Sequence, residues 1–236
     1  MLDRSVTIKH LGMVRAKVRI RFRKDGDLRQ IGHHDLMRCF ERLLRRAALP
    51  FHSTQGFNPK PRLLFPLPLP LGIVGCQEVA ELELDSDISA EEVHSRLAQQ
   101  TPAGLEILDV RRIDGAGTTH ARLACYRIAM PLGQSDTVPQ RLAALMQAAS
   151  CWVERQRPER RRIDVRPYLK DLRFRDGAVE MDLVVTPTGT ARPEEVLGLL
   201  GLADLLEQGA VFERTHLVLD DECIAALPAA PAVSVG

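Results

Sequence analysis

Three polar residues, His33, Asp35 and Arg38, open a stretch whose apolar residues recur at helical spacing. An imidazole can transfer a proton and a guanidinium can stabilise charge on a phosphate, so this set could cleave RNA without a metal. The unpaired amides at a helix start also favour anions, so a phosphate could bind there without any reaction. A structural role is also open, with Asp35 capping the helix and His33 bonded to a neighbouring backbone group. The residue types therefore permit catalysis, anion binding or capping.

The loop after this helix, QGFNPK, carries side chains that could contact a nucleic acid. Phe57 offers a ring for stacking on a base, and Lys60 offers a charge for a phosphate. Gln55 and Asn58 offer hydrogen-bonding edges. In the alternative, the glycine and the Asn-Pro pair only make turns, and Phe57 fills the core.

A basic strand is predicted before the helix. Apolar and charged residues alternate in KVRIRFRK, which is typical of a half-buried strand whose charged face carries Arg19, Arg21 and Arg23. The 32 Lys and Arg residues of the chain are nearly balanced by 31 Asp and Glu, but residues 13–62 hold thirteen basic residues against four acidic ones. Such a local field can steer an anionic partner. A second run, Arg160 to Arg162, could follow a phosphate backbone or simply face solvent.

The order of the predicted elements indicates the fold class. The basic strand, the helix, an alternating proline segment at residues 62–71 and two strands flanking a short helix give the order β-α-β-β-α-β, which begins again after DGAGTTH. The sequence therefore predicts an α+β fold of two tandem ferredoxin-like (βαββαβ) repeats with antiparallel sheets. The repeats are expected at residues 1–115 and 116–222, followed by a flexible tail at 223–236. A proline at every second position confines residues 62–71 to an edge strand or polyproline II.

Several classes of protein are not indicated. No window approaches the ~18 uninterrupted apolar residues of a membrane span, and the start has no apolar core for a secretory signal, so we expect a cytoplasmic chain with no membrane partner. The five cysteines are scattered and never in CxxC spacing, and the histidines lack ligand spacing, so no metal is expected. No Walker loop occurs and no GxGxxG follows a strand, so no nucleotide cofactor is expected.

The runs GHHDLMRCFERLLRRAALP at residues 32–50 and STQGFNPKPRLLFPLPLPLG at residues 53–72 resemble one known family. It is the bacterial radical SAM-linked domain family, whose function is unknown; IDVRPYLKDL at residues 163–172 resembles a weaker second motif. The resemblance implies a radical SAM protein as a partner, and gene neighbours that encode ribonuclease E/G and ribosomal proteins. It brings no activity of the domain itself.

Residue by residue, the resemblance places His33, Asp35 and Arg38 on the family's helix start, and residues 55–59 on its loop. His34 departs from the pattern, because an apolar residue is usual at that position. The chain has no CxxxCxxC for an iron-sulfur cluster, so it is not expected to be the radical enzyme.

We therefore expect a non-catalytic RNA-binding or substrate-presenting accessory module that works with a radical SAM enzyme or with RNA-processing or ribosome-associated machinery. The RNA is left open among tRNA, rRNA and mRNA. One alternative is a metal-independent endoribonuclease, with His33 as general acid or base and Arg38 or Lys60 stabilising the phosphorane. Another is a protein-binding adaptor whose proline-rich edge strand docks a partner. The candidate RNA-binding residues are Arg19, Arg21, Arg23, His33, Asp35, Arg38, Gln55, Phe57, Asn58 and Lys60.

Overall fold

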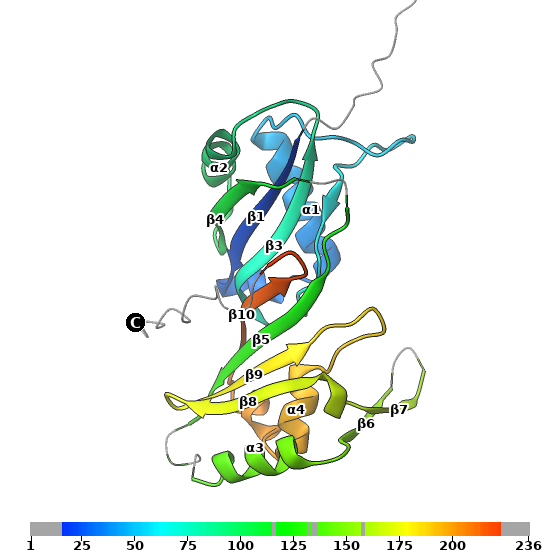
Figure 1. The fold of residues 1–236 in the computed structure, drawn as a ribbon. Coiled ribbons are helices and arrows are strands. Elements are labelled where there is room, and N and C mark those ends of the chain that lie inside the picture. The colour runs from blue at the N-terminus through cyan, green and yellow to red at the C-terminus, as the bar shows by residue number, and fades with distance from the viewer. Residues whose placement is uncertain (1–15, 115–116, 132, 134–135, 157–158, 223–236) are drawn as a thin grey trace, which may run out of the picture.

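The computed structural model describes residues 16–114, 117–131, 133, 136–156 and 159–222. The protein is a mixed α+β structure with few helices and one mostly antiparallel main sheet (Figure 1). The strands of this sheet follow the order β4-β1-β3-β10-β5-β9-β8, and β2 pairs with β3 outside this path. Among the described helices, none has the length and apolar content to cross a bilayer. The expected tail at residues 223–236 lies outside the described residues.

The first half of the chain packs two helices on one face of its strands. It consists of β1 (Ala16–Lys24), α1 (His33–Arg46), β2 (Leu63–Leu64), β3 (Val74–Leu84), α2 (Ala90–Ala98) and β4 (Leu105–Arg112), with a 3₁₀ turn at Gly26–Gln30. Val18, Ile20 and Phe22 of β1 are fully buried in a cluster with apolar residues of both helices. The ring of Phe22 meets that of Phe40 in α1 edge-on, with 4.9 Å between centroids. The predicted alternation thus places its apolar face beneath the helices.

The second half has its own core. It consists of β5 (Ala121–Ala129), α3 (Val138–Gln147), β8 (Leu169–Arg175), β9 (Ala178–Val184), α4 (Pro193–Leu199), α5 (Asp204–Glu207) and β10 (Phe212–Leu219). β8 and β9 form the predicted hairpin around Asp176 and Gly177, which both have positive φ, as the twist of a two-residue turn favours. Met181 of β9 and Leu197 of α4 are fully buried in the same cluster.

A second hairpin, β6 (Trp152–Arg155) with β7 (Arg161–Asp164), forms a separate two-stranded sheet (Figure 1). It lies between α3 and a 3₁₀ turn at Arg166–Tyr168. Val153 and Ile163 are paired across the hairpin and pack against the second core. The sequence predicted only a basic block here, because two apolar residues are too few to define an alternating pattern.

The two halves share one continuous sheet instead of two. β10 runs parallel to β3, with Glu213 opposite Val74 and Arg214 opposite Gly75. This parallel pair corrects the expectation of purely antiparallel sheets. It arises because β2 covers β3 only at Leu82 and Glu81, which leaves the other end of that long strand open for β10.

The proline-rich segment is a strand over much less of its length than expected. Only Leu63 and Leu64 are in a strand, and residues 65–73, which lead into β3, are not in a strand. Proline has no backbone N–H to donate to a ladder, so the alternation of prolines ends the strand at once. The predicted strand at residues 62–71 is therefore corrected to a two-residue edge strand and an irregular segment.

Candidate functional site

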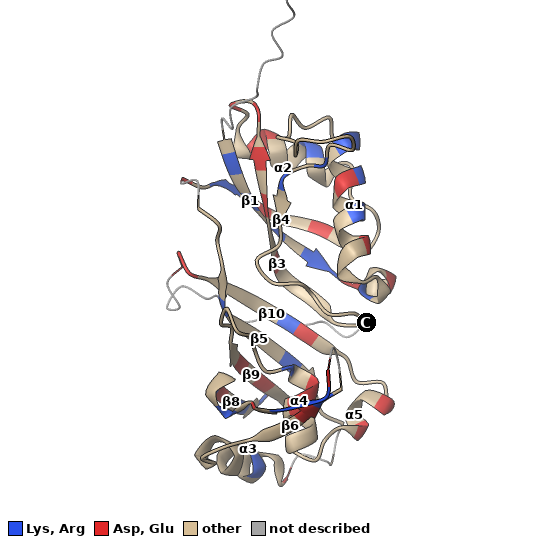
Figure 2. Ribbon diagram, turned by 90° about the vertical axis from the view of Figure 1, so that its right-hand side faces the viewer, with Lys and Arg blue, Asp and Glu red and all other residues tan. Residues whose placement is uncertain are grey.

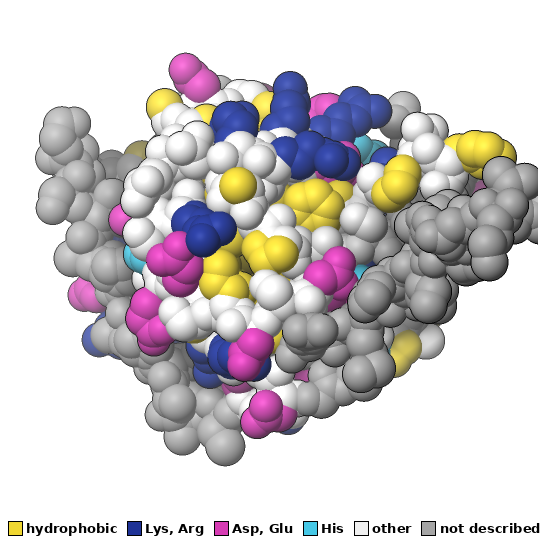
Figure 3. Space-filling view, turned by 90° about the horizontal axis from the view of Figure 1, so that it is seen from above, with side chains coloured by type: hydrophobic (Ala, Val, Ile, Leu, Met, Phe, Trp, Pro, Cys, Tyr) yellow, Lys and Arg dark blue, Asp and Glu magenta, His cyan; other side chains and the backbone are white. Residues whose placement is uncertain are grey.

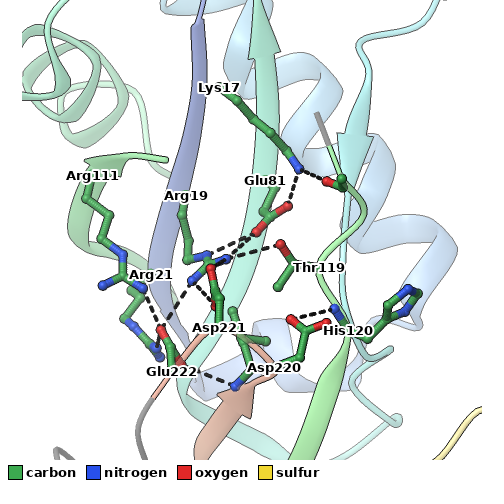
Figure 4. A network of polar contacts seen from close by, with 12 residues as sticks. Lys17, Arg19, Arg21, Glu81, Arg111, Thr119, His120, Asp220, Asp221 and Glu222 are labelled. Carbon is green, nitrogen blue, oxygen red and sulfur yellow. Dashed lines mark hydrogen bonds and ion pairs between the residues drawn. The ribbon is translucent and has the colours of Figure 1, made fainter. Parts of the chain in front are cut away.

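Arg19 of β1 is buried in a polar network instead of facing solvent (Figure 4). Its Nη2 lies 2.7 Å from Glu81 Oε1 and 2.8 Å from Asp221 Oδ2, and it donates to Thr119 Oγ1 at 3.1 Å. Burial opposes the charge, but hydrogen bonds to Asp221 and Glu81 outweigh it and raise the pKa of Arg19 above its ordinary value. The guanidinium is thus committed to internal ion pairs.

The other arginines of β1 are also paired with carboxylates. Nη2 of Arg21 and Nη2 of Arg111 each lie 2.6 Å from Glu222 Oε1, and Arg23 Nε lies 2.6 Å from Asp25 Oδ2. The acidic run that follows β10 therefore neutralises the basic face of β1 (Figure 4). In the sequence this run is DDE directly after a predicted strand, and its pairing with β1 was not predicted.

The start of α1 brings His33 into a packed position. Its imidazole meets the ring of Phe65 edge-on, with 5.4 Å between centroids. Nδ1 of His33 is buried and has no hydrogen-bond partner among the described residues. Burial is the largest cause that lowers the pKa of His33, and the neighbouring His34, Arg214 and Lys24 lower it further. The ring is therefore held in its neutral form near pH 7.

Asp35 does not cap α1. The N-cap is Gly32, with no side-chain hydrogen bond, and Asp35 Oδ1 instead accepts from Arg38 Nη1 at 3.2 Å on an exposed surface. Neither of the structural roles considered for His33 and Asp35 is found among the described residues. This helix start keeps one exposed ion pair, which weakens its attraction for a phosphate.

A charged cluster that the sequence analysis missed lies beneath His33, at the junction of the two halves. Arg214 is fully buried; its Nε donates to Glu78 Oε1 at 2.7 Å, and its other nitrogens donate to the backbone oxygens of Leu67 and Pro68, each at 3.1 Å. Lys24 is also fully buried and donates to a backbone carbonyl of residue 31 at 2.9 Å. Burial is the main cause that lowers the pKa of Lys24. The one sign of this cluster in the sequence was Glu78, a charged residue on the strand face that otherwise points to the core, where it lies opposite Phe22.

The outer face of α1 holds basic side chains that no carboxylate neutralises among the described residues. Arg42, Arg45 and Arg46 donate only to backbone oxygens, at 3.3, 3.4 and 2.9 Å. The guanidinium of Arg45 also lies 5.5 Å from the centroid of the Phe51 ring. Figure 3 shows Lys and Arg side chains gathered beside hydrophobic ones at this end of the molecule. Cationic and apolar groups are thus presented together.

The loop beside this face exposes Phe57 completely. Two contacts tie the base of the loop: Thr54 N donates to Lys60 O at 2.8 Å, and Lys60 N donates to Thr54 Oγ1 at 3.1 Å. Gln55 and Asn58 are exposed, and the Lys60 ammonium lies 3.9 Å from a Glu41 oxygen. Of the two roles considered for Phe57, filling the core is therefore wrong.

The structure separates the ten candidate residues into two groups. Arg45 donates to the backbone of Pro59, so α1 and the loop form one surface on the side of the sheet that α1 covers (Figure 2). The arginines of β1 alternate with apolar residues that pack beneath α1, so they lie on the opposite face of the sheet. We set aside His33, which is packed, and Asp35, which pairs with Arg38, and we call the rest of the first group, together with Arg42, Arg45 and Arg46, the α1–loop surface. It consists of Arg38, Arg42, Arg45, Arg46, Gln55, Phe57, Asn58 and Lys60.

No metal centre is apparent, since no three His, Cys, Asp or Glu side chains of the described residues are grouped to hold an ion. One shallow pocket of about 380 Å³ adjoins the β1 network and is lined by Lys17, Thr119, Asp114, Asp220 and Asp221, among others. Its carboxylates outnumber its single lysine, which disfavours a phosphate there.

These observations describe an α+β protein with a neutralised sheet face and a basic, partly aromatic helix–loop surface. The chain belongs to a bacterial family whose model, described as "Uncharacterized protein conserved in bacteria (DUF2344)", matches residues 17–193, well over half of its length. The matched residues include the α1–loop surface and the β6–β7 hairpin, and they end at the first residue of α4. A search of the curated proteins finds no match.

Proposed function

We propose that the protein is a non-catalytic RNA-binding accessory module and that the α1–loop surface is its RNA contact. The observation that carries the proposal is Phe57, fully exposed on a tied loop beside Arg42, Arg45 and Arg46. Burying a phenylalanine is worth about 1.5–3 kcal/mol, so a ring left wholly in solvent beside cations is typical of a binding surface. Aromatic rings stack on unpaired bases, and arginines pair with the adjacent phosphates.

We further propose that the two halves are tandem ferredoxin-like repeats divided near residue 115. The support is the strand order: when only the strands of the main sheet are counted, which leaves out β6 and β7, both β4-β1-β3-β2 and β10-β5-β9-β8 run fourth, first, third, second within their halves. Sheets of this type present RNA-binding surfaces in several proteins, which is an analogy at the level of the fold only. Here the proposed contact lies on the helix side.

The expected partner is a radical SAM protein, or RNA-processing or ribosome-associated machinery in the cytoplasm. This part of the proposal rests on the resemblance of residues 32–72 to radical SAM-linked domains. Its test is affinity purification from cells, in which the bound RNA is sequenced and the bound proteins are identified. Recovery of protein partners without RNA would favour the adaptor.

The binding test uses a fluorescent single-stranded oligonucleotide and its anisotropy. Phe57→Ala should weaken binding by about 5- to 100-fold, because stacking is worth about 1–3 kcal/mol per base. Leu71→Ala removes another exposed apolar side chain and should leave affinity unchanged. Arg46→Gln should also reduce the slope of log K against log salt by about 0.7, since one phosphate contact is lost. Equal affinities for Phe57→Ala and Leu71→Ala would refute the proposed contact.

The endoribonuclease remains a second candidate because of one observation, the neutral His33 ring, which could accept a proton. A nuclease of this kind should cleave RNA in the presence of EDTA and leave a cyclic phosphate. His33→Ala should then lower the rate by about 10²–10⁴-fold with affinity nearly intact. Cleavage that shows this dependence on His33 would replace the binding module with the enzyme.

A further inference from the structure

The β6–β7 hairpin exposes the only tryptophan of the chain. Successive residues of a strand point to opposite faces, so the packing of Val153 and Ile163 on the second core directs Trp152 away from it. Trp152 is 49% exposed. Tryptophan is enriched at binding interfaces, and this ring lies beside a charged side chain on the face of the hairpin away from the core.

A guanidinium lies over this ring. Arg162 is on the same face of the hairpin as Trp152, with its central carbon 4.8 Å from the ring centroid. Neither Arg162 nor its neighbour Arg161 has a carboxylate partner among the described residues, whereas Arg160 pairs with Glu154 at 3.1 Å. The ring therefore lies beside one cation, Arg162, that no carboxylate of the described residues neutralises, while Arg161 points to the opposite face of the hairpin.

The hairpin is also anchored at both ends of β6. Arg155 Nε lies 2.6 Å from Glu195 Oε1 in α4, and its Nη2 donates to Thr190 O at 2.7 Å. At the other end of β6, Cys151 N donates to Asp164 Oδ1 at 2.7 Å. These contacts fix the backbone that carries Trp152, so little ordering is needed on binding.

We propose that this hairpin is a second contact for single-stranded RNA, at which Trp152 stacks on an unpaired base and Arg162 binds the adjacent phosphate. The inference rests on the proposed RNA-binding function and adds a site in the second half of the chain. Charge complementarity favours a polyanion as the occupant, because the guanidinium over the ring has no carboxylate partner among the described residues. Figure 1 shows the hairpin and the loop with Phe57 projecting from the same side of the molecule.

The single tryptophan makes the test specific to this site. Full-length protein is titrated with an oligouridylate of about 12 nucleotides, and both the fluorescence of Trp152 and the anisotropy of the labelled oligonucleotide are followed. The two signals should saturate together, with the tryptophan emission quenched. Trp152→Ala should weaken binding by about 5- to 100-fold, and Trp152→Phe, which keeps an aromatic face, by less. Leu206→Ala removes an exposed apolar side chain of α5 and should leave the affinity unchanged.

The outcomes separate this inference from the proposed function. If the oligonucleotide binds while Trp152 emission stays constant and Trp152→Ala binds equally well, the hairpin site is wrong and the α1–loop surface stands. If the wild-type protein does not bind at low salt, both proposals fail. Equal circular dichroism melting curves for Trp152→Ala and wild type show that the variant folds, so a loss of affinity is then assigned to the lost ring.

Discussion

Arg214→Met should strongly destabilise the fold, because this guanidinium serves four acceptor positions at once. Its loss leaves the Glu78 carboxylate buried at 2% exposure and leaves the carbonyls of Leu67 and Pro68 without a donor. Removing one partner of a buried ion pair costs about 3–5 kcal/mol, mostly through the uncompensated charge that remains. Lys24 stays near Glu78 and offsets part of that charge, so we expect the free energy of unfolding to fall by about 3–4 kcal/mol.

Urea denaturation followed by far-UV circular dichroism measures this loss. The matched control is Arg173→Met, which breaks pairs with Asp171 and Asp182 at a 45% exposed arginine and should cost about 1 kcal/mol or less. The double variant Glu78→Gln with Arg214→Met removes the buried carboxylate together with its guanidinium and leaves only the Lys24 ammonium in the cluster, so its loss should be smaller than the sum of the single losses by about 1–3 kcal/mol. The reasoning is refuted if Arg214→Met lowers the free energy of unfolding no more than Arg173→Met does. It is also refuted if the losses of Glu78→Gln and Arg214→Met add strictly in the double variant.

Two further predictions concern stability. Folding lowers the pKa of His33 below its ordinary value of 6.5, so the unfolded chain binds a proton more readily than the folded one. The free energy of unfolding should therefore fall as the pH drops through 6.5, until the pH passes the folded-state pKa. Unfolding curves at about pH 7.5 and 5.5 should show a smaller fall for His33→Gln than for wild type, and equal falls would contradict the shift. Gly104 has a φ of +80°, and a Cβ there would lie 2.7 Å from the Asp25 carbonyl oxygen, so Gly104→Ala should lower the melting temperature more than Gly177→Ala, which has a φ of +68° but open space around it.

The elements with a strong local pattern could be predicted from the sequence. The alternation in β1, the helical spacing in α1 and the Asp176–Gly177 turn depend on neighbouring residues, and each was found where expected. The pairing of the β1 arginines with carboxylates could not be predicted from local pattern, because the partners of Arg19 are Glu81 and Asp221, 62 and 202 residues away in the chain. An alternating basic strand looks the same whether acidic residues or solvent cover it.

The candidate site was likewise predictable by residue type but not by tertiary contacts. The loop around Phe57 was identified by residue type, but only the three-dimensional structure shows that the ring is exposed instead of buried. Arg42, Arg45 and Arg46 were not among the candidate residues, because their lack of carboxylate partners depends on tertiary placement. Trp152 was missed altogether, since the hairpin that carries it has only Val153 and Ile163 to reveal its inner face.

The parallel seam between β3 and β10 has a consequence for synthesis on the ribosome. β10 is made after every other described strand, and it brings Arg214 to Glu78 and, just beyond it, Asp221 to Arg19. Until then, a nascent first half holds the Glu78 carboxylate at a position that the finished fold buries, without its guanidinium partner, and burying it costs several kcal/mol. Chains that stop before β10 should therefore stay loosely packed and open to proteases, so the seam acts as a check that translation has run to the end of the second half.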